Sequence, residues 1–255
     1  MSNMRLDLYL VEKGYFKSRS KAKVAIEANN VSINGNIANK SSLEVNDSDI
    51  IEIIGESNPY VSRGGLKLEA AIKEFYLDFN NKVIVDIGAS TGGFTDCALK
   101  HGAKKVYAID VGTNQLASEL LDDSRVISLE QTNILDIEFF PEPIDYYVMD
   151  VSFVSIEHLL PGINNFIDDN NALICLIKPQ FEVGKKYMKN GIVKDRTVHI
   201  NVIENIVKAL AEYSLGFAKL IPSPILGGSG NKEFLALIKR NVKNKVNIVE
   251  VCSKE

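Results

Sequence analysis

The sequence predicts an α/β protein in which a small α/β module precedes an open, mostly parallel sheet flanked by helices. From residue 83 onward, strand-like apolar runs alternate with helical patterns, which is the rhythm of a doubly wound sheet. The first of these runs ends in Asp86 and leads into a glycine-rich turn, as in a nucleotide-binding βα unit. Farther along, the connection over residues 227–230 is too short for a helical crossover. We therefore expect the last strand pair to be antiparallel.

Length and composition fit two domains. The 255 residues, 45% of them hydrophobic, can bury the core of one large or two small domains. We expect a first domain over residues 1–58, a linker over 59–64 and a second domain over 65–255. Pro59 and its polar neighbours break any periodic pattern at this boundary.

Charge and cysteine content exclude several classes of protein. The net charge of −4 and the pI near 5.6 carry no global nucleic-acid signature, so any RNA binding must come from a local patch. The three cysteines are far apart and the three histidines lack metal spacing, so we expect neither a disulfide framework nor a metal. The sequence shows no signal peptide and no apolar run near the roughly 18–20 residues that span a bilayer. We expect a soluble, cytoplasmic protein.

The first 58 residues predict a set of short elements. Apolar residues over 6–11 indicate a first helix, and Ser18 can cap a second helix over 19–28. The pair Asn34-Gly35 between two apolar segments predicts a type I′ hairpin, because both central positions need φ > 0. A further strand is expected over 49–54.

Basic residues cluster in the same module, and no acidic residue lies between Lys13 and Ile26. Lys13, Lys17 and Lys21 are predicted to share one helical face that could follow a phosphate backbone. A solvated helix face is the alternative that this pattern alone leaves open. The candidate RNA-binding residues are Arg5, Lys13, Lys17, Arg19, Lys21, Lys23 and Arg63.

A helix is predicted to begin at Leu66, and Lys67 stands in its first turn. A cation is mildly unfavourable there because of the helix dipole, so Lys67 needs another reason for its position. We expect that reason to be a substrate.

The glycine-rich turn predicts a cofactor-binding loop. Gly88, Gly92 and Gly93 follow the buried run. Asp110 lies 22 residues beyond Gly88, about where a βαβ unit places the acid that holds ribose hydroxyls. The order G-x-x-x-G-G differs from the dinucleotide fingerprint, and Asp86 would repel a pyrophosphate but could hold a cationic amino-acid group. These features favour S-adenosylmethionine, with a nicotinamide or flavin cofactor, or no cofactor, as the alternatives still open.

The second domain presents polar residues at strand ends. Ligands of an open α/β sheet bind beyond the carboxyl ends of its strands. Asp150 and Lys178 stand at two such ends, and Glu233 begins the last, antiparallel strand, which faces the same edge. With Lys67 they form a set of two lysines and two acids. Strands are expected near residues 126–129, 144–149, 172–177, 217–222 and 233–239, and helices over 156–167 and 197–213.

Five motifs carry a resemblance to a known family. They read Ser62-Arg63-Gly64-Gly65 followed by Lys67, Asp86-Ile-Gly-Ala-Ser-Thr-Gly-Gly-Phe-Thr95, Val148-Met-Asp-Val-Ser-Phe153, Ile177-Lys-Pro-Gln-Phe-Glu-Val-Gly184 and Gly228-Ser-Gly-Asn-Lys-Glu233. In these motifs the chain resembles the TlyA proteins, ribosomal RNA 2′-O-methyltransferases related to the FtsJ or RrmJ enzymes and sometimes called haemolysins. The resemblance implies a Rossmann-like class I domain that uses S-adenosylmethionine, with a mostly parallel seven-stranded sheet and an antiparallel last strand.

The first module resembles the αL-type RNA-binding domain of a small-subunit ribosomal protein and of pseudouridine synthases. The likeness rests on the order of a helix, a Ser18-Arg-Ser-Lys-Ala22 helix and a Val31-x-Ile-Asn-Gly35 hairpin. The triplet Arg5-Leu6-Asp7 is not the catalytic triplet of the synthases, which lies in a later, separate domain. The likeness implies ribosomal RNA or a ribosomal subunit as the partner.

The resemblance also implies roles for single residues. The family's catalytic tetrad falls on Lys67, Asp150, Lys178 and Glu233, with Lys178 as the candidate to orient or deprotonate a ribose 2′-hydroxyl. Family members often carry arginine at the position of Gln131 and tryptophan at that of Tyr60. Together with Asp86, the implied cofactor contacts are Gly88, Ala89, Ser90, Thr91, Gly92 and Phe94 near methionine and ribose, Asp110 on the ribose hydroxyls and Asn133 near adenine.

The function that the resemblance implies is methyl transfer from S-adenosylmethionine to the ribose 2′-hydroxyl of a cytidine in ribosomal RNA. Shorter family members are associated with the large subunit only, and a first helix that begins almost at Arg5 favours large-subunit RNA here. A non-catalytic RNA-binding or assembly factor and a cytolysin are the alternatives. Neither a spanning segment nor a long amphipathic helix in the sequence supports a cytolysin.

Overall fold

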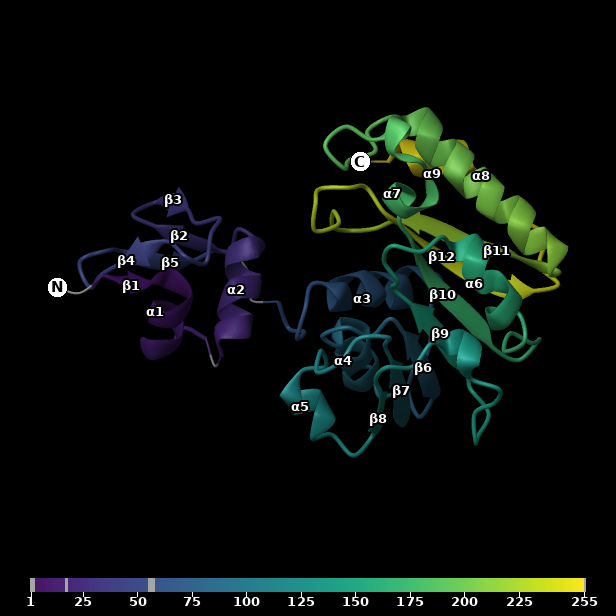
Figure 1. The fold of residues 1–255 in the computed structure, drawn as a ribbon, viewed down its shortest axis with the longest axis horizontal. Coiled ribbons are helices and arrows are strands. Elements are labelled where there is room, and N and C mark those ends of the chain that lie inside the picture. The colour runs from purple at the N-terminus through teal and green to yellow at the C-terminus, as the bar shows by residue number, and fades with distance from the viewer. Residues whose placement is uncertain (1–2, 17, 55–57, 255) are drawn as a thin grey trace. The chain divides into compact units, whose positions relative to one another are not determined.

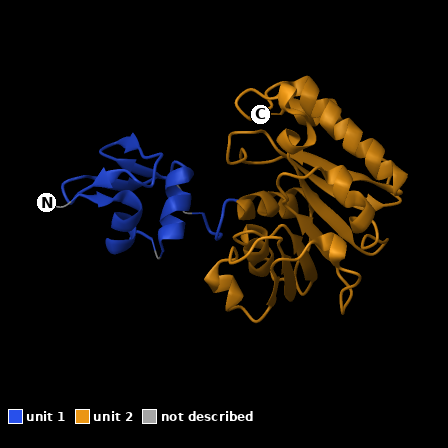
Figure 2. Ribbon diagram, viewed as in Figure 1, with its two compact units in different colours: residues 1–63 blue, residues 64–255 orange. Residues whose placement is uncertain are grey.

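The computed structural model describes residues 3–16, 18–54 and 58–254 of the chain. The chain divides into two compact units, Met1–Arg63 and Gly64–Glu255, which we call the N-terminal and the C-terminal unit (Figure 2). Each unit encloses a hydrophobic core of its own.

Short helices and short antiparallel strands make up the N-terminal unit (Figure 1). Strand β1 pairs with β4, and β2 lies between β3 and β5. Leu6, Leu10 and Ile26 are fully buried in the core between the helices and the strands. The elements are β1 (Met4–Arg5), α1 (Leu6–Glu12), α2 (Arg19–Glu27), β2 (Val31–Ile33), β3 (Asn36–Ile37), β4 (Glu44–Val45) and β5 (Ile51–Ile53).

The local signals at the start of α2 and in the hairpin are confirmed. The side chain of Ser18 accepts a hydrogen bond from the backbone N–H of Lys21, with 3.4 Å between Oγ and N. Asn34 and Gly35 have φ angles of 51° and 79°, as a type I′ turn between β2 and β3 requires. The turn fixes the register in which Ser32 faces Ile37.

The expectation that Lys13 shares a helical face with Lys21 is wrong. Helix α1 ends before Lys13, which is its C-cap residue, whereas Lys21 and Lys23 belong to α2. No one helix therefore carries both Lys13 and Lys21. Lys17 lies outside the described residues, and Arg63 is the last residue of the N-terminal unit.

The C-terminal unit contains the predicted mostly parallel sheet, with strand order β11-β12-β10-β9-β6-β7-β8. Strand β12 is antiparallel to both of its neighbours, and the other pairs are parallel. The prediction of an antiparallel last strand is therefore confirmed. The strands are β6 (Val83–Ile87), β7 (Lys105–Ile109), β8 (Val126–Leu129), β9 (Tyr146–Met149), β10 (Ala172–Ile177), β11 (Leu215–Pro222) and β12 (Phe234–Arg240).

Alternation along the strands separates the two faces of this sheet. On β6, Val83, Val85 and Ile87 belong to the core shared with α6, α8 and α9, while Asp86 points the other way and contacts Thr95 of α4. Helix α3 packs on α4, and α8 contacts both α6 and α9 (Figure 1). The helices are α3 (Gly64–Phe75), α4 (Gly93–Lys100), α5 (Ser118–Leu121), α6 (Ile156–Ile163), α7 (Pro179–Glu182), α8 (Arg196–Glu212) and α9 (Ile248–Ser253), with 3₁₀ turns η1 (Ile134–Asp136) and η2 (Lys185–Tyr187).

Helix α6 ends earlier than its sequence pattern suggests. It stops at Ile163 rather than near Ile167, although both side chains are buried. The guanidinium of Arg240 donates hydrogen bonds to the carbonyl oxygens of Asn164 and Ile167. These carbonyls are thereby satisfied outside a helix, which removes the need to continue it. Within the described residues, no helix is long and apolar enough to cross a membrane.

Candidate active site

The sheet brings the predicted catalytic residues to one edge. Strands β9 and β10 are parallel and end at this edge, whereas β12 is antiparallel and begins there (Figure 1). Ile177 of β10 pairs with Phe234 of β12. Lys178 directly follows Ile177 and Glu233 directly precedes Phe234, so the two residues are neighbours at this edge. Asp150 directly follows the last residue of β9.

Lys178 and Asp150 form an ion pair. Their Nζ and Oδ1 atoms are 2.6 Å apart, and the side chains are only 11% and 20% exposed. Nζ also donates a hydrogen bond of 2.8 Å to Oγ of Ser152, and it lies 5.7 Å from the ring centroid of Phe181. Three groups therefore fix the ammonium at the edge of the sheet.

Lys67 and Glu233 form the second pair. Nζ of Lys67 donates a hydrogen bond of 2.6 Å to Oε2 of Glu233, whose side chain is 3% exposed. Nε2 of Gln180 donates to the other oxygen, Oε1, over 3.3 Å. Lys67 reaches Glu233 from α3, which packs against β12. Because Lys178 caps α7 and Gln180 lies within it, both ion pairs are attached to the start of this helix.

A cavity of about 520 Å³ adjoins this edge between the turn after β6 and the ends of β7 and β9. Of the predicted cofactor residues, Gly88, Ser90, Asp110 and Asn133 line it, and so does Asp150 of the tetrad. The carboxylate of Asp110 is held at the rim, because it accepts hydrogen bonds from the backbone N–H groups of Ser90 (2.8 Å) and Gly112 (2.7 Å).

Gly88 is required by the close packing at this cavity. Its φ is +81°, and a Cβ atom would lie 3.0 Å from the carbonyl oxygen of Asp150 and 3.1 Å from Cγ1 of Val151. A side chain here would strain the backbone and push against the segment that carries Asp150.

Other predicted cofactor residues do not line the cavity. Gly92 has a φ of +93°, which favours glycine, and a Cβ atom there would also lie 2.2 Å from Cδ1 of Leu120 and 2.8 Å from Cδ1 of Leu116. Ala89 and Phe94 are buried, and Thr91 is exposed outside the cavity lining. The residues absent from the lining are Asp86, Ala89, Thr91, Gly92 and Phe94.

Asp86 is a buried carboxylate beneath this loop. Its Oδ2 accepts a hydrogen bond of 2.6 Å from Oγ1 of Thr95, and Oδ1 has no hydrogen-bond partner in the described part of the chain. Burial raises the pKa of Asp86 to about 7, the negative charges of Asp150 and Asp110 add to the rise, and the Thr95 hydrogen bonds oppose it. The carboxyl group therefore changes its charge near neutral pH.

This pKa makes the stability of the cofactor-free chain depend on pH. The pKa of Asp86 is higher in the folded chain than its ordinary value of 3.8, so proton binding by Asp86 adds to the free energy of unfolding. This contribution is complete below pH 3.8 and is lost as the pH rises to about 7. Asn cannot ionise, so Asp86→Asn should gain stability over the wild type by about 1.4 kcal/mol per unit from about pH 5 to 7, and nothing further above.

Denaturant unfolding of the wild type and of Asp86→Asn over a pH series measures this gain. Asp122→Asn, which alters an exposed carboxyl group, is the control and should show no such trend. A stability difference between Asp86→Asn and the wild type that is constant with pH would contradict the assignment.

Several predicted RNA-binding residues are paired within the N-terminal unit. Arg5 Nε lies 3.0 Å from Oδ1 of the buried Asp7, and a guanidinium nitrogen of Arg19 lies 2.9 Å from its Oδ2. The hydrogen bond from Arg5 leads the effects that lower the pKa of Asp7 to about 2. Lys13 Nζ lies 2.6 Å from Oδ1 of Asp47. Asp7 thus joins the start of α1 to α2, which is a structural role.

Three polar residues that the sequence analysis did not single out also belong to the site. Thr95 and Gln180 donate to predicted carboxylates, and Ser152 accepts from a predicted lysine. All three lie inside the quoted motifs, and Ser152 and Gln180 each stand two residues after a tetrad member, Asp150 or Lys178. That spacing, directly after a strand end, is the signal that could have found them.

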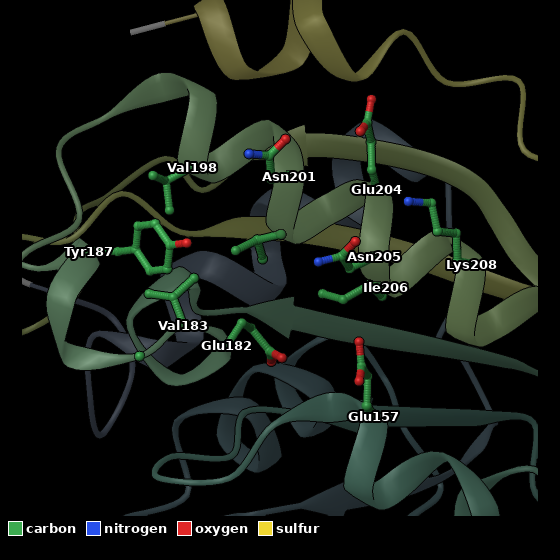
Figure 3. Close-up of a pocket in the computed structure, with 12 residues that line it drawn as sticks. Glu157, Glu182, Val183, Tyr187, Val198, Asn201, Glu204, Asn205, Ile206 and Lys208 are labelled. Carbon is green, nitrogen blue, oxygen red and sulfur yellow. The ribbon is translucent and has the colours of Figure 1, made fainter.

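A second cavity, of about 380 Å³, lies between α6, α7 and α8 and contains no predicted site residue (Figure 3). Glu182 lines it and also accepts hydrogen bonds from Oγ of Ser155 and the backbone N–H of Ile156, which caps α6. Tyr187 lines the cavity from η2. Across residues 3–16, 18–54 and 58–254, no group of three His, Cys, Asp or Glu side chains could hold a metal ion.

The chain has the fold of a class I methyltransferase of the type that uses S-adenosylmethionine. Its sheet has one antiparallel strand, β12, and its cavity lies between the turn after β6 and Asp110, which follows β7. The model of FtsJ-like methyltransferases matches residues 60–240, and the S4 domain matches residues 4–51. The 16S/23S rRNA (cytidine-2'-O)-methyltransferase TlyA of Mycobacterium tuberculosis is 35% identical over 92% of this chain and 89% of its own. The chain belongs to the TlyA family of FtsJ-like methyltransferases, and the resemblance seen in the motifs is confirmed.

Other relatives span the chain equally well. Hemolysin A of Brachyspira hyodysenteriae is 44% identical over 91% of this chain and 98% of its own. The 23S rRNA (cytidine-2'-O)-methyltransferase TlyA of Campylobacter jejuni is 34% identical over 93% of this chain and its whole length. A solved structure from Streptococcus thermophilus, provisionally described as a hemolysin, has 40% identity and a TM-score of 0.78, and it covers 99% of this chain and 95% of that one.

Proposed function

We propose that the chain transfers a methyl group from S-adenosylmethionine to the ribose 2′-hydroxyl of a cytidine in large-subunit ribosomal RNA. The observation that carries this proposal is the position of Asp150. Asp150 lines the cavity of the cofactor loop and also forms the ion pair with Lys178, so the cofactor cavity and the tetrad meet at one residue.

The residues around the cavity fit this cofactor. Asp110 stands at the rim with both carboxylate oxygens fixed by backbone N–H groups, in the place where ribose hydroxyls would be held. Asp86 lies beneath the loop and outside the cavity lining, and its unpartnered Oδ1 suits the ammonium group of the cofactor's amino acid through a water molecule. Gly88, Ser90 and Asn133 supply the rest of the cradle. When bound, S-adenosylmethionine supplies a methyl group activated by a positively charged sulfur.

The tetrad then acts on the RNA hydroxyl. Lys178 is fixed by Asp150 and Ser152 and orients the 2′-hydroxyl, so that its oxygen bonds to the methyl carbon as the carbon–sulfur bond breaks. The proton that the hydroxyl loses passes to the carboxylate of Asp150, directly or by relay through the Lys178 ammonium. Lys67 and Glu233 fix the start of β12. Through the hydrogen bond from Gln180 they also fix the start of α7, and so help to position Lys178, which precedes this helix.

The RNA substrate is proposed from the relatives and from the N-terminal unit. The relatives from M. tuberculosis and C. jejuni are both named as methyltransferases of 23S rRNA, the large-subunit RNA, that act on a cytidine 2′-oxygen. The match of residues 4–51 to the S4 domain supports an RNA partner.

Transfer of labelled methyl groups from S-adenosylmethionine to unmodified 23S and 16S rRNA and to intact subunits tests the proposal. We expect label in 23S rRNA, at one cytidine whose 3′ linkage has become resistant to alkaline cleavage, because the 2′-oxygen no longer attacks the phosphate. RNA binding without transfer to any of these substrates would contradict the proposal and favour a non-catalytic assembly factor.

A further inference from the structure

The segment that follows α7 carries a concentrated positive charge on the C-terminal unit. Residues 185–194, which we call the basic loop, contain four lysines and no acidic residue, in a chain whose net charge is −4. The side chains of Lys185, Lys186, Lys189 and Lys194 are exposed. None of the four forms an ion pair with any other described residue, in contrast to Arg5, Lys13 and Arg19 of the N-terminal unit.

The basic loop has a fixed conformation. It begins with η2, and it then turns back in a short hairpin in which Lys189 and Ile192 exchange both backbone hydrogen bonds, at 2.9 and 3.0 Å. Asn190 and Gly191 have φ angles of 52° and 77°, which such a two-residue turn requires. Lys189 is thereby held at the base of a rigid turn.

The hairpin of the basic loop is fastened to the turn that carries Glu233. Asn231, whose side chain is buried, accepts a hydrogen bond from the backbone N–H of Val193 at 2.9 Å and donates one to the carbonyl of Gly191 at 3.0 Å. Asn231 stands two residues before Glu233. At the other end of the loop, Tyr187 lines the cavity that Glu182 also lines (Figure 3).

The lysines of the basic loop therefore lie beside the catalytic edge of the sheet, because α7 joins the loop to Lys178 and Asn231 joins it to the turn before Glu233. A nucleotide whose 2′-hydroxyl reaches Lys178 must bring its flanking phosphates close to this edge. Exposed lysines without acidic partners are suited to phosphate, since each contact releases counterions.

We propose that the basic loop binds the phosphate backbone of the RNA strand next to the methylated nucleotide. The proposal rests on the proposed RNA methyltransferase function and adds an RNA contact on the C-terminal unit, separate from the S4 domain. It assigns to the loop the task of seating the strand at the active site.

Charge reversal in the full-length chain tests this proposal. In Lys185→Glu, Lys186→Glu, Lys189→Glu the binding of unmodified 23S rRNA transcribed in vitro should weaken at least about tenfold, and the slope of log K against log salt should fall by roughly 2 to 3. The control Lys104→Glu, Lys239→Glu, Lys245→Glu changes the same number of exposed lysines: Lys104 precedes β7, Lys239 stands near the end of β12 and Lys245 follows it.

Two further readouts separate a binding role from a folding defect. The dissociation constant for S-adenosylmethionine, measured by calorimetry, should equal that of the wild type in both triple variants. In methyl transfer, KM for RNA should rise at least about tenfold in the basic-loop variant, in proportion to the lost affinity, and kcat at saturating RNA should change little. The control variant should keep both values.

Specific outcomes would overturn the proposal. An RNA affinity and salt slope equal to those of the control variant would do so. So would binding of the wild-type chain to vesicles of anionic phosphatidylglycerol that the basic-loop variant alone loses, with RNA binding unchanged. Absence of methyl transfer by the wild type would instead count against the proposed function, and the salt slopes would still decide the role of the loop.

Discussion

Replacement of Lys178 by alanine is expected to lower kcat for methyl transfer by about 10²- to 10⁴-fold. Lys178 forms an ion pair with Asp150, which lines the cavity, and its replacement removes the group proposed to orient the ribose hydroxyl. Lys178 itself does not line the cavity, so the affinity for S-adenosylmethionine should change little. Single-turnover transfer of labelled methyl to 23S rRNA and calorimetric titration of the cofactor measure the two effects.

Two companion variants sharpen this test. Lys104→Ala removes an exposed lysine outside the site and should leave kcat unchanged. Lys178→Arg keeps a cation next to Asp150 but cannot lose a proton near neutral pH. Partial activity in Lys178→Arg would assign Lys178 the role of orienting the hydroxyl. A loss of activity as deep as in Lys178→Ala would assign it a role in transferring the proton. Wild-type kcat in Lys178→Ala would remove Lys178 from the mechanism.

The second large effect concerns the pair Lys67–Glu233. Removing one partner of a buried ion pair leaves the other charge uncompensated, which typically costs about 3–5 kcal/mol. Lys67→Met would leave the carboxylate of Glu233, 3% exposed, with only the amide of Gln180 as a hydrogen-bond donor among the described contacts. We expect the free energy of unfolding to fall by this amount, which calorimetry would record as a Tm lower by roughly 6–20 °C.

The double variant Lys67→Met, Glu233→Gln distinguishes stability from catalysis. It removes both charges and keeps an amide that Gln180 can still contact, so most of the lost stability should return. Activity should stay low in the single and the double variant, because both belong to the proposed tetrad. A double variant no more stable than Lys67→Met alone would show that the pair's charge is not what stabilises this region.

Much of the C-terminal unit could be predicted because its signals are local and strong. Continuous β-branched runs identified the buried strands, and the connection over residues 227–230 was too short for anything but an antiparallel pair. Parallel strands end at one edge by topology, so Asp150 and Lys178 could be expected there before their contacts were known. In the N-terminal unit, Ser18 and Asn34-Gly35 were predictable because caps and tight turns depend on single residues.

Features that depend on tertiary packing could not be predicted in this way. The sequence does not show that Lys178 pairs with Asp150 while Lys67 pairs with Glu233, since strand order and side-chain rotamers decide this. Gly92 looks like a ligand-binding glycine, and only the structure shows that its φ of +93° and the nearby Leu120 side chain favour glycine there. The strands β1 and β4 are two residues long and form no periodic pattern, and the end of α6 depends on a distant guanidinium.

The amide of Asn231 has a consequence for how the chain meets its substrate. Ordering a loose segment during binding costs roughly 1–2 kcal/mol of conformational entropy per residue, which is subtracted from the affinity. Both ends of this amide are already engaged by the hairpin of the basic loop, so the hairpin is ordered when the chain folds. If the basic loop binds RNA as proposed, its surface beside Glu233 is preorganised. A strand with the wrong shape would then meet a surface that is already ordered, and selectivity among RNA strands would follow.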